Sequence, residues 1–366
     1  MKGRSLLMIP GPTEFEPDVL AATGAPTVSH LAPSFVEAFA GALAAMRQVW
    51  LSPSGQPFVV AGSGTFAMEL AVASLVEPGD RAVVASTGVF GDRYADLLTR
   101  HGAEVRVVHA PVGEAVDLEQ LEDAVRSTSA RLFTVTHVDT STGVRTPVSE
   151  LGAIARRRGA ICVVDGVCSV AGEEIRQDSW GLDVVLTASQ KAIGVPPGLA
   201  LLVAGPRAIE RFEARRTPVR SYYGDWGKWL PVLRGYESGA PGYFGTPAVN
   251  LVAALAVSLQ RIVSEGMDAR FRRHEILAGA FQAGVEALGL PQVPARPEWR
   301  AHTLSACHLP EGVSLSEFVR AVGESGVVIA GGLHPDLRAR TFRVGHMGSV
   351  RAGAVLATLG AVEAGL

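Results

Sequence analysis

The chain has 366 residues, of which 48% are hydrophobic and 19% charged, and its formal net charge is −3. This length suffices for a sizeable core and about two domains, and the near-neutral charge excludes a global field that favours nucleic acid or anionic lipid. Three cysteines without metal-ligand spacing indicate a reducing compartment rather than a disulfide framework. No apolar stretch approaches the ~18–20 residues of a membrane helix or resembles a secretory signal, so we expect a cytoplasmic protein with no nucleic-acid or membrane partner.

From residue 58 onward, short apolar runs end in small or polar residues and alternate with amphipathic segments such as 66–76 and 118–127. The alternation predicts an α/β fold with a mainly parallel seven-stranded sheet flanked by helices. Ligands of such sheets bind outside the carboxyl ends of the strands, so residues at these ends are candidates for a site. The predicted strands span 58–62, 81–86, 104–110, 131–137, 160–166, 182–189 and 199–205.

The alternation fades after residue 205, where a stretch rich in Tyr, Trp and Gly spans 221–247. We expect its aromatic residues to serve packing or a subunit interface. A long helical segment follows over 248–266, and alternating strands are predicted at 303–309 and 341–347. The expected organisation is an N-terminal arm over 1–15, a large domain over 16–249, and a smaller C-terminal α+β domain over 250–366.

The glycine-rich turn AGSGT, residues 61–65, lies between a predicted strand and a predicted helix. Glycines permit close backbone approach, and the first N–H groups of a helix favour an anion, so the turn can cradle a phosphate. It also fits the dinucleotide-binding pattern GxGxxA, but the next strand ends in Ser86 rather than in the acid that binds a ribose. Ordinary strand-to-helix turns look similar, and the motif alone leaves phosphate binding open.

Two charged residues follow neighbouring predicted strands. Asp165 ends ICVVD, where a carboxylate is costly unless it is paired; it can cap a turn or face a cationic ligand nitrogen. Lys191 follows the next strand, in LTASQKAIGVPPG, and a lysine in a cleft can react with an aldehyde. A reactive lysine, an acid for a ring nitrogen and an anion cradle together meet the requirements of pyridoxal phosphate (PLP).

The segments IPGPTEF, AGSGTFAMELA, GVFGDR, THVDTSTGV, VVDGVCS, TASQKAIGVPPG, YFGTP and TFRVGHMG together resemble the class V aminotransferases of the alanine–glyoxylate and serine–pyruvate group. The resemblance covers nearly the whole chain. It implies the architecture of fold-type I PLP enzymes and transfer of an amino group from alanine or serine to glyoxylate or pyruvate. Another class V specificity, for an aspartate or ureidoglycine donor, stays open.

The resemblance also implies roles for individual residues. Lys191 is the lysine that binds the cofactor covalently, and Asp165 holds the ring nitrogen protonated. Arg343 grips the substrate carboxylate, and Gly11 brings backbone close to the substrate. Further cofactor contacts are expected from Ser63, Gly64, Thr65 and Gln190 at the phosphate, Thr140 at the ring hydroxyl, Phe90 and Val167 on the two ring faces, and Tyr243 and Thr246 reaching the phosphate from the neighbouring subunit of a homodimer. Phe90 stands where some relatives have tryptophan, and Thr65 where some have histidine.

Other protein classes fit fewer of these features. A nicotinamide dehydrogenase would use the GxGxxA turn but lacks the ribose acid. A cysteine desulfurase needs a mobile-loop cysteine, whereas Cys307 lies in a predicted apolar strand. A non-catalytic cofactor-binding regulator would not need Arg343. His137 and His346 lack metal-ligand spacing, and we expect them to be structural, with no metal site in the protein.

Overall fold

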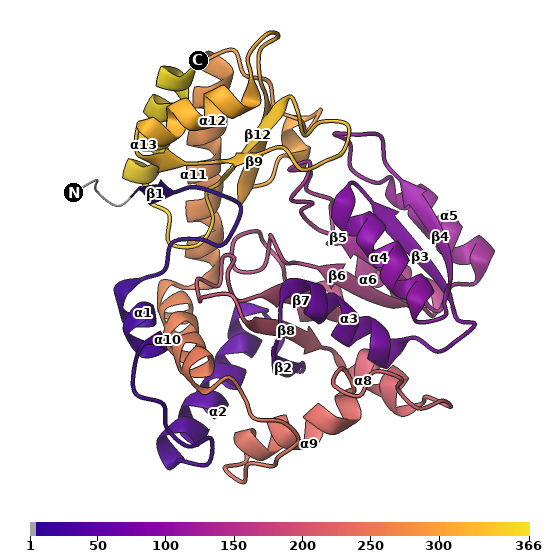
Figure 1. Ribbon diagram of the computed structural model, residues 1–366. Coiled ribbons are helices and arrows are strands. Elements are labelled where there is room, and N and C mark those ends of the chain that lie inside the picture. The colour runs from indigo at the N-terminus through magenta and orange to yellow at the C-terminus, as the bar shows by residue number, and fades with distance from the viewer. Residues whose placement is uncertain (1–4) are drawn as a thin grey trace.

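A computed structural model describes residues 5–366, and its centre is one seven-stranded sheet in the order β2-β8-β7-β6-β5-β3-β4 (Figure 1). Strand β8 runs antiparallel to both of its neighbours, and the other pairs are parallel. The predicted mainly parallel sheet of seven strands is therefore confirmed. The strands are β2 (Gln56–Ala61), β3 (Arg81–Ser86), β4 (Glu104–His109), β5 (Leu132–Thr136), β6 (Ile161–Asp165), β7 (Val184–Ala188) and β8 (Leu199–Ala204).

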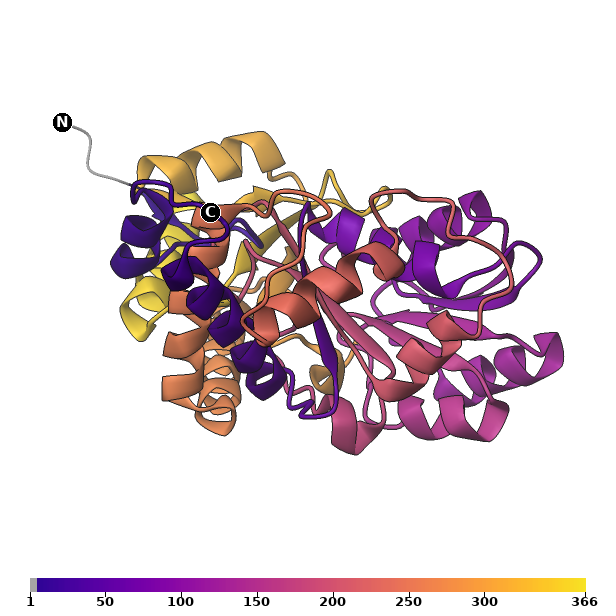
Figure 2. The same ribbon diagram turned by 90° about the horizontal axis from the view of Figure 1, so that it is seen from below.

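Helices connect the successive strands from β2 to β7 and two more follow β8, and Figure 2 shows helices above and below the strands. They are α3 (Gly64–Leu75), α4 (Val89–Arg100), α5 (Leu118–Thr128), α6 (Leu151–Arg158), α7 (Gln177–Trp180), α8 (Pro206–Glu213) and α9 (Trp226–Glu237). With helices on both sides, β6 and β7 are buried along their whole length. This explains why their sequences are nearly continuous apolar runs rather than alternating ones.

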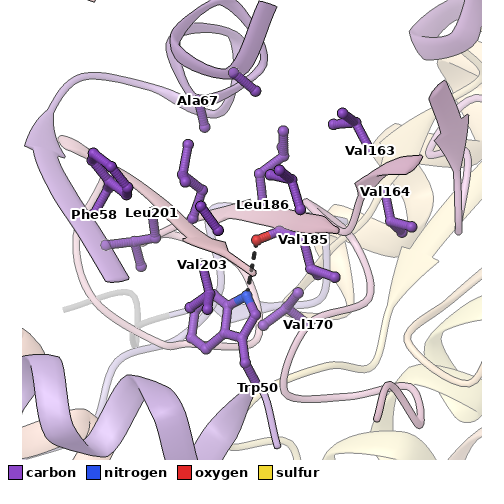
Figure 3. Packing of buried hydrophobic residues seen from close by; sticks show 14 of the residues in the cluster. Trp50, Phe58, Ala67, Val163, Val164, Val170, Val185, Leu186, Leu201 and Val203 are labelled. Carbon is purple, nitrogen blue, oxygen red and sulfur yellow. Dashed lines mark hydrogen bonds between the residues drawn. The ribbon is translucent and has the colours of Figure 1, made fainter. Parts of the chain in front are cut away.

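The core around β7 is closed by large aromatic side chains (Figure 3). Trp50 is buried at the end of a helix and donates its indole N–H to the carbonyl oxygen of Val185 at 3.0 Å. The ring of Phe58 lies 4.8 Å, centre to centre, from that of Trp226. Trp226 comes from the aromatic-rich stretch, so this part of the stretch serves packing, as predicted.

Three helices extend the same core beside the sheet: α1 (Pro17–Thr23), α2 (Pro33–Val49) and α10 (Val249–Glu265). Helix α10 packs against α1 and α2, and its buried residues belong to the large hydrophobic cluster of the sheet. The cluster includes the first half of the next helix, α11 (Met267–Ala287), whose second half joins a separate cluster. The division at residue 250 stays a prediction, while the packing places α10 with the sheet.

The second cluster lies between the strands and helices of the C-terminal part. These elements are β9 (Leu304–His308), α12 (Leu315–Glu324), β10 (Val327–Val328), β11 (Ala330–Gly331), β12 (Thr341–Gly345) and α13 (Ala352–Gly365), with a short 3₁₀ helix at Pro297–Trp299. The N-terminal strand β1 (Leu6–Leu7) pairs in parallel with β10, and Met8 is buried in this cluster. Figure 1 shows this indigo segment beside the yellow C-terminal elements. Within residues 5–366, no helix combines the length and apolar character needed to cross a membrane.

Candidate active site

The carboxyl ends of β6 and β7 bring Asp165 and Lys191 to the same edge of the sheet. The two strands are adjacent and parallel, with Asp165 level with Leu186. The first turn of α3 lies against the same edge: a Cβ added at Gly64 would lie 3.0 Å from a methyl carbon of Val167 and 3.2 Å from Cβ of Ala188. Three of the predicted features, from three separate segments, therefore converge.

Asp165 is buried at the end of β6, with 2% of its surface exposed. One carboxylate oxygen accepts the backbone N–H of Val167 at 2.9 Å. Burial raises the pKa of the Asp165 carboxyl from 3.8 to about 7; Asp139 adds to the increase, and Arg93 and Lys191 oppose it. A cation placed beside this carboxyl would restore its ionised form.

The side chain of Lys191 runs along the backbone of the N-terminal arm. Its Nζ donates a hydrogen bond to the carbonyl oxygen of Pro10. Gly11 has a φ of +104°, and an added Cβ would lie 2.7 Å from Cδ and 2.8 Å from Nζ of the lysine. Only glycine fits this backbone conformation and this approach. Gly11 therefore lies at the reactive amine, and its contact with a substrate stays a prediction.

The predicted phosphate cradle is the N-terminus of α3. Ser63 caps the helix by accepting the backbone N–H of Phe66 at 3.4 Å. The hydroxyl oxygen of Thr65 accepts a hydrogen bond at 2.9 Å from Nη1 of Arg93, a residue of α4. The side-chain oxygen of Gln190 is buried and has no hydrogen-bond partner in the part of the chain that the structure describes. The free N–H groups of the helix fit an anion, and the contact of Gln190 with a phosphate stays a prediction.

Phe90 and Thr140 are held by a group that the sequence analysis did not assign. The buried carboxylate of Asp139 accepts the backbone N–H groups of Phe90 at 3.0 Å and Ser141 at 2.8 Å. Burial raises the pKa of this carboxyl. The hydroxyl of Thr140 lies 2.7 Å from the sulfur of Cys168. The signal in the sequence is the Asp-x-Ser spacing of an Asx turn, and Asp139 thereby fixes the loop that follows β5.

Arg343 reaches this loop from β12. Its Nε donates to the carbonyl oxygen of Gly331 at 2.9 Å, and its Nη1 donates to that of Thr140 at 3.2 Å. Burial lowers the pKa of the guanidinium, while Cys168 and Asp139 oppose that change. Two of its five N–H groups are thus used for orientation, and the others can bind a carboxylate.

Tyr243 and Thr246 are not part of this group in the described structure. Tyr243 is 68% exposed, its hydroxyl lies 3.4 Å from that of Thr246, and its ring is centred 5.6 Å from the His30 ring. Within residues 5–366, neither side chain has a hydrogen bond or ring contact with the residues around Lys191 and Asp165. Their role in a neighbouring subunit stays a prediction.

The desulfurase alternative requires an accessible thiolate. Cys307 is fully buried in β9, and burial raises the pKa of its thiol to about 12. A buried and protonated thiol is not a nucleophile at neutral pH. The packing position expected for Cys307 is therefore confirmed.

Comparisons with known proteins agree with this geometry. The family model for aminotransferase class-V matches residues 18–359. Alanine–glyoxylate aminotransferase 1 of Saccharomyces cerevisiae is 36% identical, over 95% of this chain and 93% of that protein. L-aspartate–glyoxylate aminotransferase of Paracoccus denitrificans is 32% identical, over 99% and 91%. The structure of alanine–glyoxylate aminotransferase from Nostoc sp. has a TM-score of 0.93 at 33% identity, and the match covers 99% of this chain and 95% of that one.

The fold and the family match are those of a transaminase. The chain belongs to the class V aminotransferase family, which confirms the resemblance in the sequence. The three proteins compared above are all named aminotransferases, which favours a transaminase over a nicotinamide dehydrogenase or a non-catalytic regulator.

Proposed function

We propose that this transaminase uses PLP and transfers the amino group of alanine or serine to glyoxylate or pyruvate. The convergence of Asp165, Lys191 and the N-terminus of α3 at one sheet edge carries the proposal. Relatives of similar identity are named for different donors, alanine and aspartate, but share glyoxylate in their names. Glyoxylate is therefore the better supported acceptor, and the donor has to be argued from the site.

The described residues fit PLP. When bound, it supplies an aldehyde, a phosphate and a ring nitrogen that accepts electrons. The buried Asp165 carboxyl, whose pKa is raised to about 7, would become ionised beside the protonated ring nitrogen. The other contacts we assign are Ser63, Gly64, Thr65 and Gln190 to the phosphate, Thr140 to the ring hydroxyl, and Phe90 and Val167 to the ring faces.

Lys191 would act as the proton carrier. Its Nζ is directed by the carbonyl oxygen of Pro10 and by the close approach of Gly11. With PLP bound, this amine would take the proton from the substrate α-carbon and return it during the transfer. Asp165 stabilises the negative charge that develops, because it keeps the ring nitrogen charged.

Arg343 would determine which part of the substrate is bound. Its guanidinium is oriented by Gly331 and Thr140 and presents a planar fork suited to one carboxylate. We assign no second arginine to a distal carboxylate, and burying such a group without a partner costs several kcal/mol. A small monocarboxylic donor is therefore favoured over aspartate.

We also propose that the enzyme is a cytoplasmic homodimer. Its cysteines are all free and buried, as is typical of a reducing compartment. The segment with Tyr243 and Thr246 exposes two aromatic side chains, Tyr222 at 76% and Tyr243 at 68%, whose covering by a second copy would remove apolar surface from water.

A panel of amino donors tests the substrate assignment. Alanine, serine, aspartate and ureidoglycine are mixed in turn with the PLP-loaded enzyme, and the loss of the cofactor absorption band is followed in a single turnover. We expect alanine or serine to give the highest kcat/KM. A higher value for aspartate would overturn the monocarboxylate assignment.

Arg343→Lys separates the carboxylate contact from the rest of the site. We expect it to raise KM for donor and acceptor alike while PLP stays bound, because an ammonium cannot replace the bidentate fork. Arg340→Lys, at an exposed position three residues earlier, is the matched control and should leave both KM values unchanged.

A further inference from the structure

The backbone carbonyl groups of the turn that carries Lys191 accept hydrogen bonds from other segments of the chain. Four successive carbonyl oxygens, at residues 190–193, each accept a hydrogen bond from a distant segment. Thr13 donates to the first two at 3.1 Å, through its N–H and its hydroxyl. Arg270 donates to the third at 2.7 Å, and the hydroxyl of Ser258 donates to the fourth. The turn is therefore positioned by the N-terminal arm, α11 and α10 together.

Arg270 is the charged member of this set and is 5% exposed. Its Nη2 donates to the carbonyl oxygen of Ala192, its Nε to that of Ala171, and its Nη1 to a carboxylate oxygen of Glu265, each at 2.7 Å. Burial lowers the pKa of the guanidinium to about 10, so the group stays charged at neutral pH. One side chain thus connects the residue after Lys191 to the loop that follows Asp165.

The loop contacted through Ala171 is locally strained. Ala171 has a φ of +65°, a left-handed conformation that alanine adopts only when the surroundings enforce it. The loop begins at the carboxyl end of β6, directly after Asp165. Because Arg270 binds this carbonyl as well as the Lys191 turn, it links the two loops that carry the acid and the amine.

We propose that Arg270 is a positioning residue that fixes Lys191 relative to Asp165 and so sets how the cofactor is held between them. The inference rests on the proposed PLP-dependent function. Its physical basis is that a displacement of about 1 Å in reacting groups can lower a rate about a hundredfold. The guanidinium spans two carbonyls at fixed angles, and a lysine amine at the same position cannot reproduce this geometry.

The chain offers a matched control in Arg273, one helical turn further along α11. Its Nε binds the same carboxylate, that of Glu265, at 2.6 Å. Its other donors go to the carbonyl oxygens of Gly348 and Val350, each at 3.1 Å, and to neither loop. Arg273→Gln therefore removes the same charge and the same ion-pair partner without releasing the Lys191 turn.

The first measurement uses the cofactor-free protein. Amide hydrogen exchange is followed at Gly194 and Val195, whose N–H groups donate within the turn. Arg270→Gln should accelerate their exchange, and Arg273→Gln should not. Equal protection of these amides in wild type and Arg270→Gln would overturn the proposal. This readout does not need a working enzyme, so it separates the positioning role from the proposed function.

The second measurement uses the PLP-loaded enzyme. Arg270→Gln should lower kcat about a hundredfold with little change in KM, and shift the pH at which the cofactor absorption band changes, while Arg270→Lys recovers only part of kcat. If wild type transfers no amino group, the proposed function fails. If Arg273→Gln reproduces the losses of Arg270→Gln, the role of Arg270 is structural and the proposal fails.

If the glutamine variant folds poorly, chemical rescue of Arg270→Ala provides a further test. A cavity of about 960 Å³ is lined by Arg270, Ser258, Ile193 and Gly194, and its volume exceeds that of a guanidinium ion. Guanidinium chloride at low concentration should therefore restore part of the kcat of Arg270→Ala. Rescue of the melting temperature without rescue of kcat would contradict a positioning role.

Discussion

The turn after β7 and the segment 240–248 are both assigned to the same cofactor, yet the chain holds them differently. In the turn, every carbonyl oxygen from 190 to 193 has a partner from another segment. In 240–248, Tyr243 is 68% exposed, and its hydroxyl has Thr246, three residues away, as its nearest partner. The part of the proposed site around Lys191 is thus held within one chain, and we propose that the part around Tyr243 contacts a second copy.

The largest expected effect concerns Lys191, in the part of the site held within one chain. Lys191→Ala should lower turnover by more than about a thousandfold, because it removes the proton carrier. PLP should still bind through the α3 cradle and Asp165, measurable by equilibrium dialysis. Lys228→Ala, at an exposed position of α9, is the control. A Lys191→Ala enzyme with wild-type turnover would refute the assignment of the amine.

The second prediction concerns Asp165, in the part of the site around Lys191. In the cofactor-free protein, the folded state holds the Asp165 proton up to about pH 7, whereas the unfolded chain releases it near 3.8. The contribution of Asp165 to the free energy of unfolding should therefore fall by about 4 kcal/mol as pH rises through this window, while His137, His274 and His346, whose pKa values burial lowers, contribute in the opposite direction. Asp165→Asn cannot ionise and should lose the contribution of Asp165, as measured by urea unfolding from about pH 4 to pH 8.

Asp183→Asn distinguishes this contribution from that of another buried carboxyl. Burial raises the pKa of Asp183 to about 6, so its contribution to the decline ends near that pH. Between about pH 6 and pH 7, Asp165→Asn should therefore differ from wild type in its pH dependence, and Asp183→Asn should not. Equal pH profiles for wild type and Asp165→Asn would show that the carboxyl is ionised in the folded protein.

The smallest expected effect concerns Tyr243, in the exposed segment 240–248. Tyr243→Phe should weaken PLP binding at least about tenfold, because a hydrogen bond to a charged group contributes about 1.5–3 kcal/mol. Tyr222→Phe is the control, since Tyr222 is similarly exposed. Loss of affinity in both variants, or in neither, would contradict the assigned contact.

Hybrid dimers show on which chain the contact acts. Lys191→Ala mixed with the Tyr243→Phe/Thr246→Val double variant should recover about a quarter of wild-type activity, since half of the dimers are hybrids with one intact site. Activity of a monomer at assay concentration would contradict the proposal that a second copy contributes Tyr243 and Thr246 to the site.

The large sheet was predictable because its strands can be recognised from short stretches of sequence. Buried strands appear as apolar runs, and charges at their ends, such as Asp165 and Lys191, are costly enough to indicate a purpose. Strands β1 and β10 have only two residues each, Leu-Leu and Val-Val, which carry no periodicity. The helix of residues 248–266 was predictable, but which core it packs against depends on tertiary contacts.

Arg270 illustrates what sequence reasoning misses. It lies in ARFRRHE beside two other arginines, and nothing in the residue types separates them. The phase of α11 turns Arg270 and Arg273 inward, whereas the side chain of Arg272 is 69% exposed. The value of a buried guanidinium depends on which carbonyls face it, and these come from loops about 80 to 100 residues away.

The pairing of β1 with β10 has a consequence for how the protein is made. Leu6 precedes its partner Val327 in the chain, and Val327 is synthesised about 320 residues later. At ~5–20 residues per second this interval is roughly 15–60 s. Thr13, in the same arm, supplies two of the hydrogen bonds that hold the Lys191 turn. The N-terminal arm is thus anchored by its strand pairing only after residues 327–328 have been synthesised, and a nascent chain that has not reached them lacks this anchor for the segment that holds the Lys191 turn.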